Sequence, residues 1–198
     1  AKEGLQIIAF AEYELGDFEA ALAASERFLR IYPTSEGADG MLYIKGESLL
    51  RQVPDVTRDQ DVARQALQAD QELLDRYPNS QYADEARLNI VAINDQLAGQ
   101  EMLVGRYYLE RREYVAAVNR FRLVVEEYDT TRHVEEALYR LTEAYLAMGL
   151  VAEAQTAASV LGNNFPASEW YQRAYNLLGA GGLEPRRGGG NWLNGLFR

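Results

Sequence analysis

Catalytic chemistry has few side chains to draw on in this sequence. The 198 residues include one histidine, His133, and no cysteine. Disulfides, thiolate metal sites and histidine-rich metal sites are therefore excluded, and a Ser-His-Asp triad would have to use His133, at the start of a predicted helix. The carboxylate pairs Glu126-Glu127 and Glu135-Glu136 stand at predicted helix ends, where a solvated face explains them better than a general acid–base pair. We expect no enzymatic activity, no cofactor and no metal.

Phosphate, nucleic acid and lipid binding are also disfavoured. The sequence has no GxxxxGK[ST] loop, and the glycine run 188–190 lies in the C-terminal tail rather than between a strand and a helix. A net charge of −10 argues against a nucleic-acid partner and against electrostatic docking on anionic lipid. No run of 18 apolar residues occurs, so we expect no membrane-spanning segment.

Side chains typical of protein interfaces gather in one part of the sequence. Tyrosine and arginine are enriched at binding hot spots, and the chain contains 13 tyrosines, most of which we expect to fill contacts between helices. One cluster is basic and aromatic in an otherwise acidic protein: Arg106, Tyr107, Tyr108, Arg111, Arg112, Asn119 and Arg120. This cluster predicts a partner interface, with an ordinary solvated face as the alternative.

The elements that would position these residues follow from a phrase that recurs four times. Each copy has an aromatic residue, usually a proline, one further residue, and a serine or threonine: Tyr32-Pro33-Thr34-Ser35, Tyr77-Pro78-Asn79-Ser80, Tyr128-Asp129-Thr130-Thr131 and Phe165-Pro166-Ala167-Ser168. Proline cannot continue a helix, and serine or threonine is a favoured N-cap, so we expect one helix to stop and the next to start there. The copies are 45, 51 and 37 residues apart, the last close to the ~34-residue tetratricopeptide period. The phrase predicts an all-α solenoid of tetratricopeptide (TPR) helix pairs, with inserted residues in the two longer intervals.

Apolar periodicity supplies the helix ranges. We expect helix pairs at 3–15 and 17–32, 35–52 and 60–77, 80–112 and 114–128, and 131–148 and 150–164, closed by a capping helix at 168–178. The segment 80–112 is either one helix about 50 Å long or two helices broken near Gly99.

We expect one solenoid domain over residues 1–178, with N-terminal repeats at 1–78 and C-terminal repeats at 79–178. A flexible glycine-rich tail would follow at 179–198. Its end carries Trp192, Leu193, Leu196 and Phe197 at helical spacing. An exposed apolar end gains nothing in water, so these four side chains predict a docking segment, with a disordered end as the alternative.

An ordered set of these segments resembles the BamD (ComL) family, the TPR lipoproteins of the outer-membrane β-barrel assembly (BAM) machinery of Gram-negative bacteria. The likeness covers about residues 3–178 and is carried by the stretches 59–67, 77–83, 97–98, 101–108 and 114–120 together with Arg111. The phrase Tyr77–Tyr82 alone is shared by other periplasmic repeat proteins, so the specific signal is the set with the long 80–112 segment.

The resemblance implies a non-enzymatic adaptor, lipid-anchored on the periplasmic face of the outer membrane through an N-terminal acylated cysteine that this chain does not contain. It implies that the C-terminal repeats bind the periplasmic POTRA region of a BamA-like protein, beside other BAM lipoproteins. Arg120 falls at the family's contact arginine, and Tyr107, Tyr108, Arg111 and Asn119 would be its neighbours.

The N-terminal repeats would receive the C-terminal segments of unfolded outer-membrane proteins. This role points to the groove residues Tyr13, Tyr43 and Lys45.

Two other functions compete with this one. A different periplasmic TPR scaffold, such as the coordinator that links peptidoglycan synthesis to envelope constriction, shares the recurring phrase but keeps near-regular repeats of ~36 residues. The irregular intervals here favour the assembly adaptor. An enzyme built on a helical solenoid is the weakest alternative, because the chain has one histidine and no cysteine.

Overall fold

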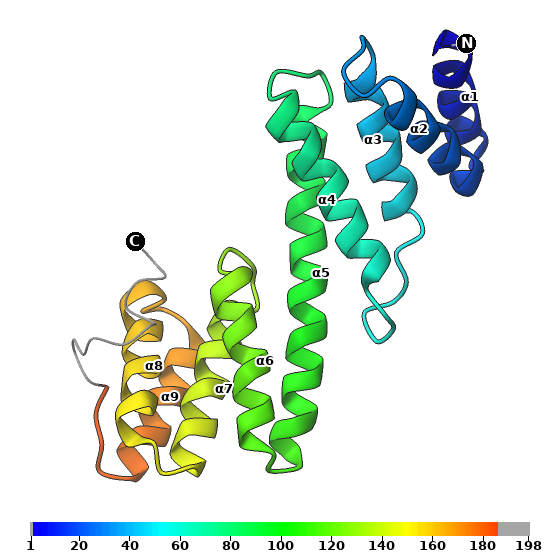
Figure 1. Ribbon diagram of the computed structural model, residues 1–198. Coiled ribbons are helices and arrows are strands. Elements are labelled where there is room, and N and C mark those ends of the chain that lie inside the picture. The colour runs from blue at the N-terminus through cyan, green and yellow to red at the C-terminus, as the bar shows by residue number, and fades with distance from the viewer. Residues whose placement is uncertain (1, 186–198) are drawn as a thin grey trace. The chain divides into compact units, whose positions relative to one another are not determined.

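The computed structural model describes residues 2–185, which form nine helices and no strand (Figure 1). The helices are α1 (Lys2–Leu15), α2 (Phe18–Ile31), α3 (Ala38–Leu50), α4 (Asp61–Arg76), α5 (Ala83–Glu110), α6 (Tyr114–Glu127), α7 (Val134–Ala147), α8 (Val151–Asn164) and α9 (Glu169–Ala180). The predicted all-α tetratricopeptide fold is confirmed for these residues. Within the same range, no helix combines the length and apolar character that crossing a membrane requires.

The aromatic residue of each recurring phrase ends the second helix of a pair. Tyr32, Tyr77, Tyr128 and Phe165 are the C-cap residues of α2, α4, α6 and α8, and each N–H group donates to the carbonyl four residues earlier. The aromatic ring then lies partly buried against the core of its own repeat. The aromatic residue therefore both ends the helix and completes its apolar face.

The serine or threonine that follows does not cap the next helix in most copies. Only Ser168 is an N-cap, and its Oγ accepts a hydrogen bond from the Trp170 N–H at 3.1 Å. In the other three copies the next helix begins three residues later, at the start of α3, α5 and α7. There the hydroxyls of Ser35 and Thr131 donate back to the aromatic residue's own carbonyl, at 3.1 and 2.8 Å. The prediction of an immediate helix start was wrong at these three turns because the chain inserts an extra turn.

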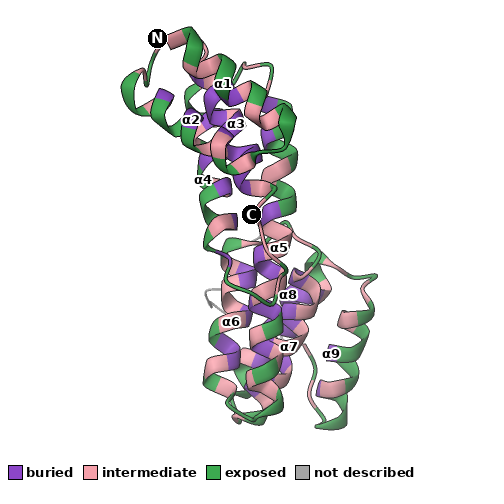
Figure 2. Cartoon of the chain, turned by 90° about the vertical axis from the view of Figure 1, so that its right-hand side faces the viewer, coloured by how far each residue is buried: buried purple, intermediate pink, exposed green. Residues whose placement is uncertain are grey.

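The chain divides into two compact units, with the boundary between Leu97 and Ala98 inside α5. In the first unit, Phe28, Met41 and Leu73 are fully buried among alanines that let the helices approach closely. The second unit has one larger core around α6, α7 and α8 (Figure 2). The prediction of a single solenoid domain over 1–178 remains a prediction.

Helix α5 runs without interruption from Ala83 to Glu110, which resolves the alternative of a break near Gly99. A second glycine, Gly105, has a packing role. A Cβ atom there would overlap the ring of Phe121, which is fully buried on α6. The glycine that weakens the helical pattern is thus what lets α6 pack closely on α5.

The start of the predicted tail is structured. Helix α9 continues to Ala180, and residues 181–185 follow it back along α8. Residues 186–198 lie outside the described residues, and so do the predicted docking side chains Trp192, Leu193, Leu196 and Phe197.

Candidate partner-binding sites

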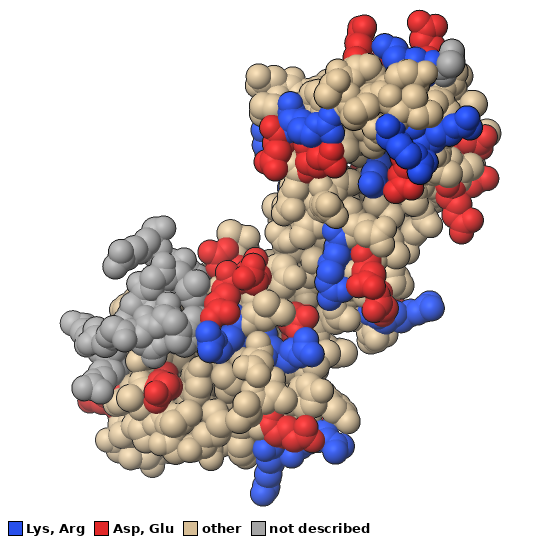
Figure 3. All heavy atoms as spheres, in the orientation of Figure 1, with Lys and Arg blue, Asp and Glu red and all other residues tan. Residues whose placement is uncertain are grey.

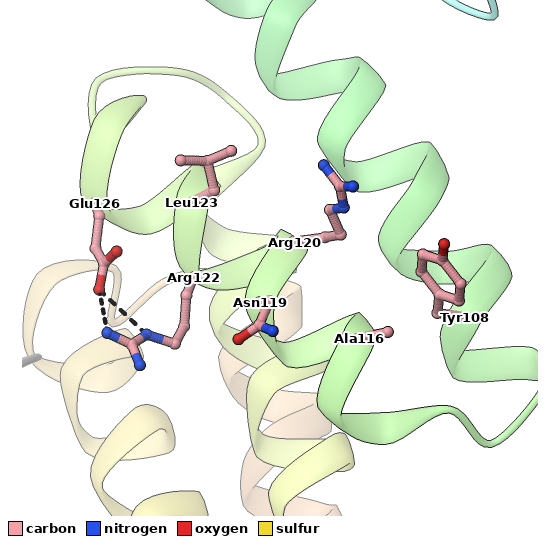
Figure 4. Close-up of a pocket in the computed structure, with 7 residues that line it drawn as sticks. All are labelled: Tyr108, Ala116, Asn119, Arg120, Arg122, Leu123 and Glu126. Carbon is pink, nitrogen blue, oxygen red and sulfur yellow. Dashed lines mark hydrogen bonds and ion pairs between the residues drawn. The ribbon is translucent and has the colours of Figure 1, made fainter.

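A cavity of about 500 Å³ opens beside Arg120 in the second unit (Figure 4). It lies between α6 and the C-terminal end of α5. Seven residues line it: Tyr108, Ala116, Asn119, Arg120, Arg122, Leu123 and Glu126. Most of these come from α6 at helical spacing, so a single helix face supplies the floor of the cavity.

Arg120 is the residue of this cavity that the sequence resemblance places at the partner contact. Its side chain is 43% exposed, and one terminal nitrogen lies 3.0 Å from Oε2 of Glu101, whose side chain is only 7% exposed. A nearly buried carboxylate needs a charged partner, so this ion pair holds the guanidinium in place. A guanidinium has five N–H donors, and the described contact with Glu101 uses one of them. The remaining donors suit a carboxylate on another molecule.

The predicted interface cluster is only partly gathered at this cavity. Tyr108 and Asn119 line it beside Arg120. Tyr107 is 55% exposed and packs edge-on against Tyr108, while the guanidinium of Arg111 lies 5.4 Å above the Tyr107 ring. These residues form a continuous aromatic and basic surface from the cavity to the end of α5.

Two further arginines of the cluster have other roles. Arg106 pairs with Glu136 of α7 at 2.8 Å and does not line the cavity. Arg112 sits in the turn between α5 and α6 with a φ of 61°, an uncommon conformation for a residue other than glycine. Both arginines belong to the predicted cluster because they lie close to its other members in sequence. In the folded chain, Arg106 contacts α7 and Arg112 lies in a turn, so neither lines the cavity.

Sequence reasoning missed two charged residues of the cavity. Arg122 and Glu126 pair with each other at 2.7 Å along α6 and form one side of the opening (Figure 4). Their spacing from Asn119, three and seven residues, is that of one helix face and could have identified them. On the visible face of the molecule, acidic and basic side chains are interspersed rather than segregated by sign (Figure 3).

The predicted groove residues lie in the first unit and are only partly brought together. The hydroxyl of Tyr13 on α1 donates to Oε2 of Glu47 on α3 at 3.0 Å, and the hydroxyl of Tyr43 donates to Oε2 of Glu85 on α5 at 3.1 Å. Burial, and then the charge of Glu47, raises the pKa of Tyr43. Lys45 does not join them, because its ammonium group pairs with Glu26 of α2 at 3.5 Å.

Glu47 is the residue that the groove prediction missed. It is 2% exposed and also accepts a hydrogen bond from Nδ2 of Asn89 at 2.6 Å. Helices α1, α3 and α5 thus each contribute one side chain to a network centred on one carboxylate.

A buried acid lies behind this network. Asp70 of α4 is fully buried, and neither carboxylate oxygen has a hydrogen-bond partner. It packs against Gly46, where a Cβ would stand 2.6 Å from Oδ1. Burial, followed by the charge of Glu47, raises its pKa to about 7, and the nearby Asn89 amide, which is bonded to Glu47, offsets this only in part. The sequence carried a signal for Asp70, since it falls on the inward stripe between Ala66 and Leu73.

Comparison with known proteins gives these sites a context. The sequence model of the YfiO family, described as outer membrane lipoprotein, matches residues 2–161. The chain belongs to this family. Membership confirms the resemblance found in the sequence and the expected location at the periplasmic side of the outer membrane.

Several relatives of this chain carry the name outer membrane protein assembly factor BamD. The Caulobacter vibrioides protein is 43% identical over 185 residues, covering 93% of this chain and 61% of its own length. The Rickettsia prowazekii protein is 37% identical over 170 residues, covering 86% and 68%. A Neisseria meningitidis serogroup A protein is 38% identical over 177 residues, covering 84% and 66%. The chain therefore spans about three fifths of the Caulobacter relative. That the relatives are assembly factors agrees with a non-enzymatic role.

Proposed function

We propose that this YfiO-family protein is an adaptor of the outer-membrane protein assembly machinery. Its second unit would bind the periplasmic POTRA region of a BamA-like protein, beside the other BAM lipoproteins. Its first unit would receive C-terminal segments of unfolded outer-membrane proteins. The names of the relatives support the assembly role, and the observation that carries the contact is the half-exposed, positioned guanidinium of Arg120.

The geometry around Arg120 supports recognition of an acidic side chain. The guanidinium is fixed by Glu101, so a partner carboxylate would lose little side-chain freedom in meeting it. Tyr108 and Asn119 offer a hydroxyl and an amide on the same cavity wall. Arginine and tyrosine around a cavity are the composition of a binding hot spot.

The arrangement of Tyr13 and Tyr43 in the first unit supports binding of an extended segment. Tyr13 and Tyr43 present ring surface for apolar side chains, and the ring of Tyr43 stacks on Tyr82 at 4.4 Å. The hydrogen bonds to Glu47 and Glu85 fix both tyrosines, so these two side chains are organised before a segment binds.

A binding assay with the isolated periplasmic domains of the BamA-like protein tests the proposal. Arg120→Glu should reduce affinity by at least ~30-fold, because losing one partner of a close charge pair costs about 2–5 kcal/mol. Arg120→Gln separates lost charge from repulsion between the new glutamate and Glu101. Arg87→Glu is the matched control, since Arg87 is 52% exposed and lies in the first unit.

Three results of this binding assay would have different meanings. Unchanged affinity for Arg120→Glu, with an unaltered circular dichroism spectrum, removes Arg120 from the interface. A glutamate-to-arginine exchange on the partner that restores binding to Arg120→Glu identifies the partner carboxylate directly. Failure of the wild-type chain to bind would favour a periplasmic scaffold with a different partner.

A further inference from the structure

The glycine pair after α9 reverses the direction of the chain. Gly182 has a φ of 71°, its N–H donates to the carbonyl of Gly179 at 3.0 Å, and the N–H of Leu183 donates to the carbonyl of Leu178 at 3.0 Å. These two bonds form a Schellman motif, the common glycine-dependent end of a helix. The glycines that suggest a flexible linker in the sequence therefore make a defined turn.

The turn returns the chain to α8. Leu183 packs on the core of the second unit, and the carbonyl of Glu184 accepts a hydrogen bond from Nε2 of Gln155 at 2.7 Å. These contacts fix the point from which the last thirteen residues depart.

A cavity of about 360 Å³ lies at that point, between α8 and α9. Tyr171 and Tyr175 of α9 form one wall, Gly162 of α8 another, and Pro185 closes a third side. A Cβ on Gly162 would overlap the Tyr171 ring, so this glycine lets the ring lie directly on α8. Tyr175 is 46% exposed and leaves apolar ring surface uncovered. The volume is in the lower range for a small-ligand site and suits one or two large side chains.

We propose that the C-terminal segment Trp192–Phe197 of this same chain seats in the cavity between α8 and α9. Six residues separate Pro185 from Trp192, and the seven steps between them, at about 3.3–3.6 Å each, can span up to about 25 Å. Glycines at 188–190 impose little stiffness on this connection. The segment supplies a Trp, a Phe and two Leu, which suit the tyrosine and proline surfaces of the cavity, while Asn194 and the backbone can meet its polar lining residues Ser159, Asn163 and Glu184.

Tethering and charge both favour this occupant. A short flexible connection gives an effective concentration in the millimolar range, so an intrinsic Kd of about 0.1 mM keeps the segment about 90% bound. Residues 186–198 carry three arginines and no acidic side chain, whereas the rest of the chain is strongly acidic. The segment would therefore be attracted to the body of its own protein.

Cysteine cross-linking of this chain tests the proposal directly, because its 198 residues contain no cysteine. The double variant Asn163→Cys/Leu193→Cys places one thiol at the cavity and one on the segment. Mild oxidation should give a cross-linked monomer. Val115→Cys/Leu193→Cys is the matched control, since Val115 is exposed on α6 outside this cavity, and it should cross-link at least about tenfold more slowly. Equal rates for the two variants, or a covalent dimer as the main product, would overturn the proposal; the dimer would assign the cavity to a second copy.

Tryptophan quenching gives an independent readout. The contribution of Trp192 is the difference between the wild-type chain and Trp192→Phe, since Trp170 is the only other tryptophan. Acrylamide quenching of that contribution should rise by up to about tenfold in Tyr175→Ala, as the bound fraction is lost, and should stay unchanged in Tyr107→Ala, a comparably exposed tyrosine. Full quenching of Trp192 in the wild-type chain refutes an occupied cavity.

Discussion

Asp70→Asn should stabilise the first unit at neutral and alkaline pH. Burial, followed by the charge of Glu47, raises the pKa of Asp70 to about 7, against an ordinary value of 3.8, and the nearby Asn89 amide compensates the ionised form only in part. Ionising this carboxyl therefore works against folding. An asparagine side chain has nearly the same shape as the protonated acid and carries no charge at any pH.

The magnitude and the pH window follow from the two pKa values. A rise of about three units corresponds to about 4 kcal/mol. The folded-state pKa is raised, so the contribution of Asp70 to the free energy of unfolding is fully present below about pH 4 and is lost as the pH rises through about 7. We expect wild type and Asp70→Asn to be similar at pH 4 and to differ by up to about 4 kcal/mol at pH 8.

Urea unfolding across pH 4–8, with amide exchange in α3 and α4 to report on the first unit, measures this difference. Asp75→Asn is the matched control, because Asp75 is an exposed carboxylate on the same helix. Parallel stability curves for wild type and Asp70→Asn over the whole pH range would refute the reasoning. That result would mean that Asp70 has access to water or to a donor in solution.

Three further predictions concern single positions. Gly105→Ala should destabilise the second unit by about 1–3 kcal/mol, because the new Cβ overlaps the buried ring of Phe121. Gly179→Ala in α9 should stabilise it by about 0.5–1 kcal/mol, because the new Cβ there meets nothing. Thermal unfolding measures both changes, and equal shifts for the two variants would contradict the packing argument. Gly182→Ala should cost about 1–2 kcal/mol because its φ is positive, and unchanged thermal stability would mean that the turn after α9 is not held in solution. Glu101→Gln should leave the fold intact and weaken binding of the POTRA region severalfold, because the Arg120 guanidinium is no longer held in place, as measured by surface plasmon resonance. Tighter binding would show that Glu101 competes with the partner carboxylate for Arg120.

The fold was predictable because its strongest signals are local. An aromatic residue followed by proline stops a helix wherever it occurs, and apolar periodicity sets the helices between the stops. The residues at which the helices begin were less predictable. Ser35 and Thr131 can either cap a helix or donate a hydrogen bond back to the preceding turn. The continuity of α5 could not be decided locally, because glycines at 99 and 105 both weaken the helical pattern, and the Phe121 ring that packs on Gly105 comes from another helix.

The candidate sites were predictable only in their composition. Arg120, Tyr108 and Asn119 share one cavity, while Arg106, equally basic and close in sequence, turns to a carboxylate on α7. Which arginine can contact another molecule depends on where the chain's own carboxylates lie in the folded structure, and no local sequence pattern encodes this. The same applies to Asp70, whose unusual protonation depends on helices that meet only in the folded chain.

The turns between helix pairs also bear on how this protein tolerates changes in length. Each turn is closed by hydrogen bonds within a few residues, so it does not depend on how long the neighbouring elements are. The extra residues of the first interval lie in the connection 51–60, where the buried amide of Gln60 ties the loop to the carbonyls of Asp55 and Arg58. Those of the second interval extend α5. The exposed loop position 57 is therefore a site where a short epitope or fluorophore sequence could be inserted without disturbing the packing of the repeats.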